Sequence, residues 1–297
     1  MLETFKKYCI RGIYTPYPPY HQGDYLEQYF LKFYLKNIEE FKKLERQFIP
    51  VCWTDLYLKA LHTINDLAID LSNLDKGKKY FTVSQHDDAP AVHLLPPDTI
   101  NFSAGGNQPN TIPIPLICSA IPNPPNQKKD IFCSFVGSIT APSTFFGVLA
   151  HDIRIKMLKV LKDKPEYLLK PRNWSEEIKK ERQDLFLDIT SRSKFTLCPR
   201  GYGATSYRMY EAMQLGSVPV YIYNDFPFIP YSDKINWDEI AILINQNDMD
   251  NLNTILKSVS DEKYNHMINK IKEIYPNYFT LEATCVNILK NLKKLNA

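Results

Sequence analysis

The sequence predicts an α/β fold of two sheets with a cleft between them. Its 297 residues exceed what one compact core normally holds, which favours two domains of about 100 to 150 residues. In both halves, apolar runs of strand length alternate with helical stretches, an order typical of parallel sheets. Five prolines between Pro113 and Pro125 interrupt this alternation, because such a segment cannot continue a central strand or helix.

The proline-rich segment sets the predicted domain boundary. We expect residues 1–122 to form an N-terminal domain and residues 123–275 to form a C-terminal domain. Residues 276–297 should form a terminal helix for which Thr280 is the N-cap, because a threonine there directly precedes an apolar-periodic run.

The elements of the first half follow from periodicity. Apolar residues at helical spacing predict an amphipathic helix over 24–47, and the run FIPVCW over 48–53 predicts a buried strand. A second helix is expected over 55–74, and the β-rich run YFTVSQ over 80–85 predicts a second strand.

The second half repeats the alternation. Apolar β-rich runs predict strands over 131–137, 167–170, 194–198, 218–223 and 240–244. The intervening stretches with helical spacing predict helices over 152–162, 175–189 and 207–215.

Composition excludes several classes of protein. The net charge of +3 includes no polybasic block, which argues against nucleic acid or an anionic membrane as the main partner. Six cysteines without a Cys-x-x-Cys pair indicate neither a zinc site nor a disulfide framework. Because no apolar run is long enough for a signal peptide or a membrane span, we expect a soluble cytoplasmic protein.

The segment PRGYGATS connects the predicted strand over 194–198 to the helix over 207–215. In parallel sheets this turn lies at the carboxyl end of the strand, where ligands bind. Gly201 and Gly203 allow a close backbone approach, and the first helical turn, capped by Thr205 or Ser206, suits a diphosphate. Arg200 with Arg208 and Glu211 on the helix would then bind phosphate oxygens and ribose hydroxyls. The alternative is that Arg208 and Glu211 form only a surface ion pair.

The longer segment FTLCPRGYGATSYRMYEAMQLGSVPVYI over 195–222 resembles the exostosin-like glycosyltransferase family. It carries a Pro-Arg-Gly turn, a Ser-x-Arg-x-x-Glu-Ala helix and a Val-Pro-Val strand in the family's order and spacing. FVGS over 135–138 precedes it, and PF at 227–228 and INW at 235–237 follow it. The similarity is clearest over about 130–245 and looser in the first half.

The resemblance implies a GT-B architecture, in which two Rossmann-like domains face each other across a cleft. It also implies an inverting transfer from a UDP-sugar to a glycan acceptor, without a metal cofactor. The N-terminal domain would lie on the acceptor side, the C-terminal domain would bind the nucleotide sugar, and the last helix would cross back to the first domain. Large animal members carry a membrane anchor and a second transferase domain, and we expect neither here. The implied donor-site residues are Arg200, Gly201, Ser206, Tyr207, Arg208 and Glu211, with Gly137 and Ser138 near the diphosphate and Arg154 as a weaker candidate.

Inverting transfer needs a base on the acceptor side. His86, Asp87 and Asp88 directly follow the predicted strand over 80–85, so they should lie at the ligand-binding end of its sheet. We rank Asp87 first, then His86, then Asp88. Further candidates, ranked behind them, are Asp24, Glu27 and Asp55. The alternative is a loop of solvated polar residues without a catalytic role. Plant-type members often have a glycine where Ala89 stands, which weakens this part of the comparison.

Two other motifs have weaker functional interpretations. Asp248-Met249-Asp250 matches the Asp-x-Asp metal pattern of another transferase architecture, but we favour Asp248 as a helix N-cap. The tyrosine- and proline-rich stretch over 14–25 could stack on sugar rings or serve only as a rigid connection.

Two functions remain open from sequence. The first is an active glycosyltransferase, with xylose favoured over glucuronic acid, galactose and N-acetylglucosamine as the donor sugar. The second is a catalytically silent subunit that binds nucleotide sugar or glycan and stabilises another transferase. An oligomer fits either function.

Overall fold

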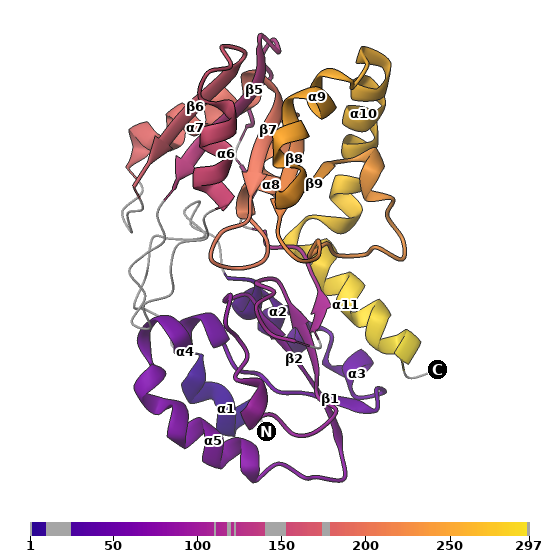
Figure 1. The fold of residues 1–297 in the computed structure, drawn as a ribbon. Helices are drawn as coiled ribbons and strands as arrows, with labels where there is room; N and C mark the ends of the chain where they lie inside the picture. The colour runs from indigo at the N-terminus through magenta and orange to yellow at the C-terminus, as the bar shows by residue number, and fades with distance from the viewer. Residues whose placement is uncertain are drawn as a thin grey trace. The chain divides into compact units, whose positions relative to one another are not determined.

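The computed structural model describes residues 2–9, 25–109, 111–117, 120–121, 123–139, 153–173 and 179–295 (Figure 1). The chain forms two compact units. The first comprises Met1–Ser119 with Tyr278–Ala297, and the second comprises Ala120–Asn277. Each unit contains one sheet of parallel strands with helices around it, which confirms the predicted α/β class with two Rossmann-like halves.

The sheet of the first unit has four strands in sequence order. They are β1 (Arg46–Phe48), β2 (Lys79–Ser84), β3 (Ile100–Ser103) and β4 (Thr111–Pro113). All three neighbouring pairs are parallel. Strand β2 is buried along its length except at Lys79, as expected for a central strand of a covered parallel sheet.

The predicted strand over 48–53 is wrong in position. Strand β1 ends at Phe48, and helix α4 already begins at Trp53. Pro50 lies between them, and its lack of an amide hydrogen prevents the strand from continuing. The predicted helix over 24–47 is likewise divided at Asn37, whose φ of −112° is not helical.

The helices of the first unit are mostly short. They are α1 (Leu2–Phe5), α2 (Leu26–Lys36), α3 (Ile38–Phe41), α4 (Trp53–Lys59), α5 (Ile64–Ser72) and α11 (Leu281–Leu295). Aromatic rings fill the space between α2, α3 and the sheet. Phe30 of α2 packs edge-on against Phe41, Phe48 and Phe81, with ring centroids 5.1 to 6.1 Å apart.

The terminal helix α11 packs beside α2 within the first unit (Figure 1). Its predicted N-cap is confirmed, because the amide of Ala283 donates to Thr280 Oγ1 at 3.1 Å. A hydrogen bond from Tyr29 to Glu282 and an ion pair between Lys293 and Glu40 flank the contact.

The sheet of the second unit has the strand order β6-β5-β7-β8-β9, and all its pairs are parallel. Its strands are β5 (Ile131–Ser138), β6 (Tyr167–Arg172), β7 (Ser193–Pro199), β8 (Val218–Tyr223) and β9 (Ile242–Asn245). All five strands predicted in this half are therefore confirmed. The chain runs from β5 outward to β6 and then resumes on the other side of β5 with β7. The topological switch point thus lies between β5 and β7.

The second unit also holds helices α6 (Ile153–Leu161), α7 (Lys180–Arg192), α8 (Tyr207–Gln214), α9 (Leu252–Lys257) and α10 (Asp261–Tyr278). The predicted capping role of Asp248 is wrong, because Asp248 lies inside a 3-10 turn over 246–251. Asn245 is its N-cap and accepts a hydrogen bond from the amide of Asn247 at 3.0 Å. Across the described ranges of both units, no helix is long and apolar enough to cross a bilayer.

Candidate active site

The predicted donor residues gather at the topological switch point of the second unit. Gly137 and Ser138 end β5, and Arg200 directly follows β7, the strand paired with β5 on this side. Because both strands are parallel, their carboxyl ends lie at the same edge of the sheet. Open α/β sheets bind ligands in the crevice at this edge.

Arg154, near the start of α6, ties these two strand ends together. Its guanidinium donates to the carbonyls of Ser138 at 2.6 Å, Arg200 at 3.0 Å and Pro199 at 3.4 Å. Three main-chain acceptors at the edge of the sheet therefore share one cation. A direct contact of Arg154 with a diphosphate stays a prediction.

Arg208, in the first turn of α8, lies against the end of β5. Its Nε donates to the carbonyl of Val136 at 3.2 Å, and its guanidinium carbon lies 4.9 Å from the centre of the Phe135 ring. Gly137 makes room for it, because a Cβ there would lie 2.9 Å from Arg208 Cζ and still closer to Nη2. Nη1 of Arg208 is buried and has no hydrogen-bond partner among the described residues. An unsatisfied buried donor of this kind is costly, and an anion would satisfy it.

The turn after β7 is held by neighbouring loops. Arg200 is only 8% exposed, and its guanidinium donates to the side chain of Asn224 and to the carbonyl of Tyr202. The hydroxyl of Tyr221 donates to the carbonyl of Ala204. Neither Asn224 nor Tyr221 was singled out from sequence, since nothing in their local pattern separates them from other residues of β8 and its loop.

The helix after the turn begins as predicted, but without the predicted side-chain cap. Ser206 is the N-cap residue of α8, yet its hydroxyl makes no capping hydrogen bond. Thr205 Oγ1 is buried without a partner in the described part of the chain. Tyr207 is the first helical residue, and Gly201 closes the turn by donating to the carbonyl of Thr205 at 3.3 Å.

Glu211 is 5% exposed, which rules out its interpretation as half of a solvated surface pair. Burial raises the pKa of the Cys198 thiol to about 12, the nearby Arg208 and Arg154 oppose this shift, and Glu211 adds to it. Three guanidinium groups and one carboxylate therefore share this edge of the sheet. The excess of positive charge suits an anionic ligand.

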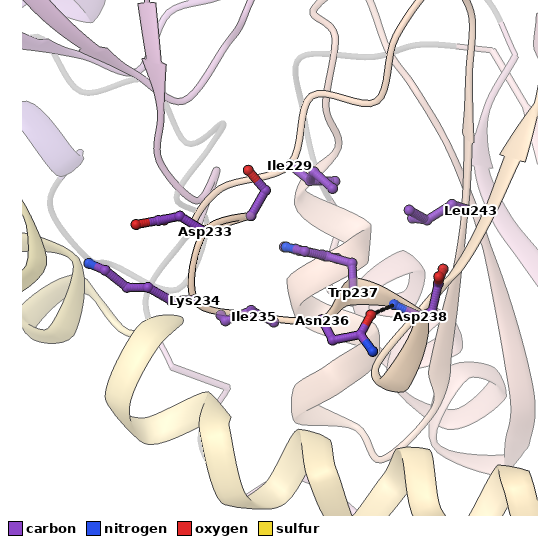
Figure 2. Close-up of a pocket in the computed structure, with 9 residues that line it drawn as sticks. Ile229, Asp233, Lys234, Ile235, Asn236, Trp237, Asp238 and Leu243 are labelled. Atoms are coloured by element: carbon purple, nitrogen blue, oxygen red, sulfur yellow. Dashed lines mark hydrogen bonds between the residues drawn. The ribbon is translucent and has the colours of Figure 1, made fainter.

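The loop between β8 and β9 encloses a separate shallow cavity of about 450 Å³ (Figure 2). Trp237 lies inside the bend of the loop, and its indole donates to the carbonyl of Pro230 at 2.8 Å. Trp237 is 3% exposed, so its ring face is not available for stacking on a ligand. The PF and INW motifs therefore shape the loop that begins with Asn224.

The predicted acceptor-side residues form one compact loop after β2. His86, Asp87 and Asp88 are each half-buried. The ring of His86 stacks on Tyr57 of α4, with centroids 4.7 Å apart and planes 23° apart. Nδ1 of His86 accepts the amide hydrogen of Asp88 at 3.2 Å. Burial lowers the pKa of His86 to about 4, against an opposing effect of Asp88.

The segment after β3 holds this loop in place. The Asn107 amide donates to the carbonyl of Asp87, and the Asn107 side chain donates to the Asp88 carboxylate at 3.1 Å. Gln108 donates to the carbonyl of Asp88 at 2.6 Å. A Cβ on Gly105 would lie 2.7 Å from the carbonyl oxygen of His86, so only glycine permits this approach. These contacts argue against a loop of freely solvated side chains.

Glu27, which ranked behind the loop as a candidate base, has a buried structural position in α2. It is 2% exposed and accepts hydrogen bonds from the amides of Gln85 at 2.6 Å and Thr54 at 2.8 Å. It thereby joins α2, the start of α4 and the end of β2. Burial, with the nearby Asp55 charge, raises the pKa of Glu27 to about 8. Asp55 itself accepts from Gln28 at 2.9 Å.

Two sequence hypotheses lack structural support here. Asp24 and the stretch over 14–24 lie outside the described residues. Asp248 and Asp250 are exposed, and the described residues contain no group of three His, Cys, Asp or Glu side chains arranged for a metal ion.

A parallel-sheet unit with a basic, glycine-containing turn at its switch point is typical of α/β proteins that bind ligands at the carboxyl ends of their strands. The chain belongs to the Exostosin GT47 domain family of glycosyltransferases, because the family's model matches residues 76–259, more than half of the chain. The match includes both the loop after β2 and the turn after β7. The predicted family resemblance is therefore confirmed.

Several plant proteins are similar to this chain. The chain is 30% identical over 141 residues to the probable glucuronosyltransferase GUT1 of Oryza sativa, covering 47% of this chain and 31% of that protein. It is also 30% identical over 116 residues to the probable beta-1,4-xylosyltransferase IRX10L of Arabidopsis thaliana, covering 39% and 26%. The matches thus span about a third or less of these relatives.

Solved structures similar to this one are distant. They include WaaG, a glycosyltransferase involved in lipopolysaccharide biosynthesis, at 9% identity and a TM-score of 0.42, covering 78% of this chain and 81% of that one. TarM is similar at 11% identity and a TM-score of 0.39, covering 72% and 54%.

Protonation of Glu27 should couple stability to pH. Its pKa is raised to about 8 in the folded protein from 4.5, so the folded state holds a proton that the unfolded state has lost between these values. The free energy of unfolding should therefore fall as pH rises through this window, by up to about 1.4 kcal/mol per pH unit. Urea unfolding at pH 5 and pH 8 should show a smaller fall for Glu27→Gln than for wild type.

The exposed Glu39 provides the control. Glu39→Gln should retain the wild-type dependence on pH, because Glu39 lies on the surface of α3. Equal pH dependence of Glu27→Gln and Glu39→Gln would contradict the assignment.

Proposed function

We propose that this protein is an inverting glycosyltransferase that moves a sugar from a UDP-sugar to a glycan hydroxyl without a metal cofactor. The observation that carries the proposal is Arg208. Its guanidinium is packed on Phe135 and against Gly137, and its Nη1 is buried without a partner among the described residues. A diphosphate bound at the switch point would satisfy this donor and the charge that surrounds it.

The donor end of the reaction needs positive charge as UDP leaves. Arg208 and Arg200 would stabilise the charge that develops on the diphosphate, and the N-terminus of α8 would add main-chain amides. Buried Glu211 would accept hydrogen bonds from the ribose hydroxyls. Arg154 would act mainly by holding the two strand ends at which the diphosphate binds.

The acceptor end needs a base. We propose that Asp87 removes the proton from the attacking hydroxyl while that oxygen forms a bond to the anomeric carbon and the bond to UDP breaks. The contacts of Asn107 and Gly105 with the loop support a fixed position for Asp87. Fixed geometry is a requirement for efficient general-base catalysis.

Similarity to a probable glucuronosyltransferase and a probable beta-1,4-xylosyltransferase favours UDP-glucuronic acid or UDP-xylose as the donor. We retain UDP-xylose as the first candidate. The silent-subunit alternative makes a different prediction in the same assay, because such a protein would bind the nucleotide and release nothing.

The direct test is release of UDP. The purified protein should release UDP from UDP-xylose or UDP-glucuronic acid faster in the presence of a β-1,4-linked xylan oligosaccharide, and release should persist in EDTA. Binding of UDP without release from any of a panel of UDP-sugars would contradict the proposed activity. Loss of release in EDTA, restored by Mg²⁺ or Mn²⁺, would contradict metal independence.

Gly137→Ala should weaken binding of UDP. The new Cβ would displace the Arg208 guanidinium from the end of β5, because it would lie 2.9 Å or less from that group. We expect affinity to fall by about tenfold or more, the effect of one lost charge-assisted hydrogen bond of about 1.5 to 3 kcal/mol. Isothermal calorimetry would measure it.

Gly77→Ala is the matched control, because Gly77 lies in an exposed loop of the first unit. Its UDP affinity should equal that of wild type. Unchanged affinity in Gly137→Ala would place the nucleotide elsewhere.

Asp87→Asn should reduce turnover by about 10² to 10⁴, the usual contribution of a general base, while UDP affinity stays the same. Asp88→Asn is the comparison variant, because the Asp88 carboxylate already accepts a hydrogen bond from Asn107. If Asp87→Asn retains full turnover in the UDP-release assay, Asp87 is not the base.

A further inference from the structure

His86 has only one nitrogen available for a substrate. Its Nδ1 accepts the amide hydrogen of Asp88 at 3.2 Å. A backbone amide always donates, so Nδ1 must carry a lone pair rather than a proton. Within the described part of the chain, Nε2 has no hydrogen-bond partner.

The hydrogen bond at Nδ1 therefore determines the tautomer. A neutral imidazole carries one proton, and with Nδ1 acting as an acceptor that proton must lie on Nε2. The neutral form is favoured because burial lowers the pKa of His86 to about 4, far below its ordinary value of 6.5. Near pH 7, Nε2 of the ring then carries a proton that it can donate to a hydrogen bond, and it has no lone pair to accept one.

The surroundings of the ring keep this arrangement. Tyr57 of α4 covers one face of the ring, and burial raises the pKa of its phenol to about 12, so it stays neutral. The titratable neighbours on the loop itself are Asp87 and Asp88. From the described residues of the segment after β3, the uncharged amides of Asn107 and Gln108 face the loop and hold Asp88 in place.

We propose that His86 binds the acceptor sugar as a neutral hydrogen-bond donor through Nε2–H, and is not the base of the reaction. The donor would bind an oxygen of the acceptor and so orient the hydroxyl that Asp87 deprotonates. Donation from a neutral ring leaves the proton on His86 throughout, so the proton of the attacking hydroxyl passes to Asp87 alone. This role rests on the proposed transferase function.

The tautomer can be measured without substrate. In protein labelled with ¹⁵N-histidine, the His86 signals, assigned by their loss in His86→Gln, should show protonated Nε2 and unprotonated Nδ1 from pH 5 to 8. They should show no titration within this range. A proton on Nδ1, or a titration near pH 6.5, would overturn the proposal whether or not the protein is an active transferase.

Two variants separate a donor from a base. His86→Gln retains an N–H donor at a similar reach, and His86→Phe keeps a ring to stack on Tyr57 but has no nitrogen. If His86 is a hydrogen-bond donor, kcat/KM for the acceptor should stay within a fewfold of wild type in His86→Gln. It should fall about tenfold in His86→Phe. The fall of kcat/KM at low pH should remain in both variants, because Asp87 is still the base.

If His86 is the base, kcat should fall by about 10² to 10⁴ in both variants, and the fall of kcat/KM at low pH should disappear. That result would overturn the proposal. UDP affinity serves as the folding control, since His86 lies in the first unit and the proposed nucleotide site lies in the second. Absence of UDP release from the wild-type protein would defeat the proposed function, and the NMR measurement would still decide the tautomer.

Discussion

The donor end of this protein depends on how the ends of two parallel strands satisfy their main-chain carbonyls. Strands β5 and β7 both end at the edge where the chain changes direction in the sheet, and Arg154 binds three carbonyls there. Buried carbonyls need partners, and a guanidinium can serve several at once. Once these ends are joined, Gly137 and Arg208 have defined positions, and this edge of the sheet carries an excess of positive charge.

The first unit solves the complementary problem for main-chain amides. There the buried carboxyl group of Glu27 accepts hydrogen bonds from the amides at the end of β2 and the start of α4. The same contacts hold the first residue of the loop that carries His86 and Asp87. In each unit, an ionisable side chain from a nearby helix ties the carboxyl end of a strand to the element beside it. Such groups are costly to bury, and their hydrogen bonds offset that cost.

The side chains that hold the main chain in place are therefore different from the side chains that we propose bind substrate or react. Arg154 and Glu27 form hydrogen bonds with main-chain groups. Arg208, in contrast, has a buried Nη1 without a hydrogen-bond partner among the described residues. The hydrogen bond from Asp88 to His86 extends the same principle to the acceptor loop, because a main-chain amide decides which nitrogen carries the proton. Tyr221 of β8 and Asn224 of the loop after β8 support the turn, and Trp237 of that loop is buried in its packing.

The sequence by itself determined the α/β class, the strands of the second half and the turn with its arginines, because periodicity and glycine placement are local properties. It misplaced the strand near Pro50 and assigned caps to Ser206 and Asp248 that the folded chain does not use. Only the tertiary structure placed the switch point between β5 and β7 and brought Glu27 to Gln85 and His86 to Tyr57. These features join residues far apart in the chain. Burial and the geometry of hydrogen bonds decide them, and no local pattern encodes either.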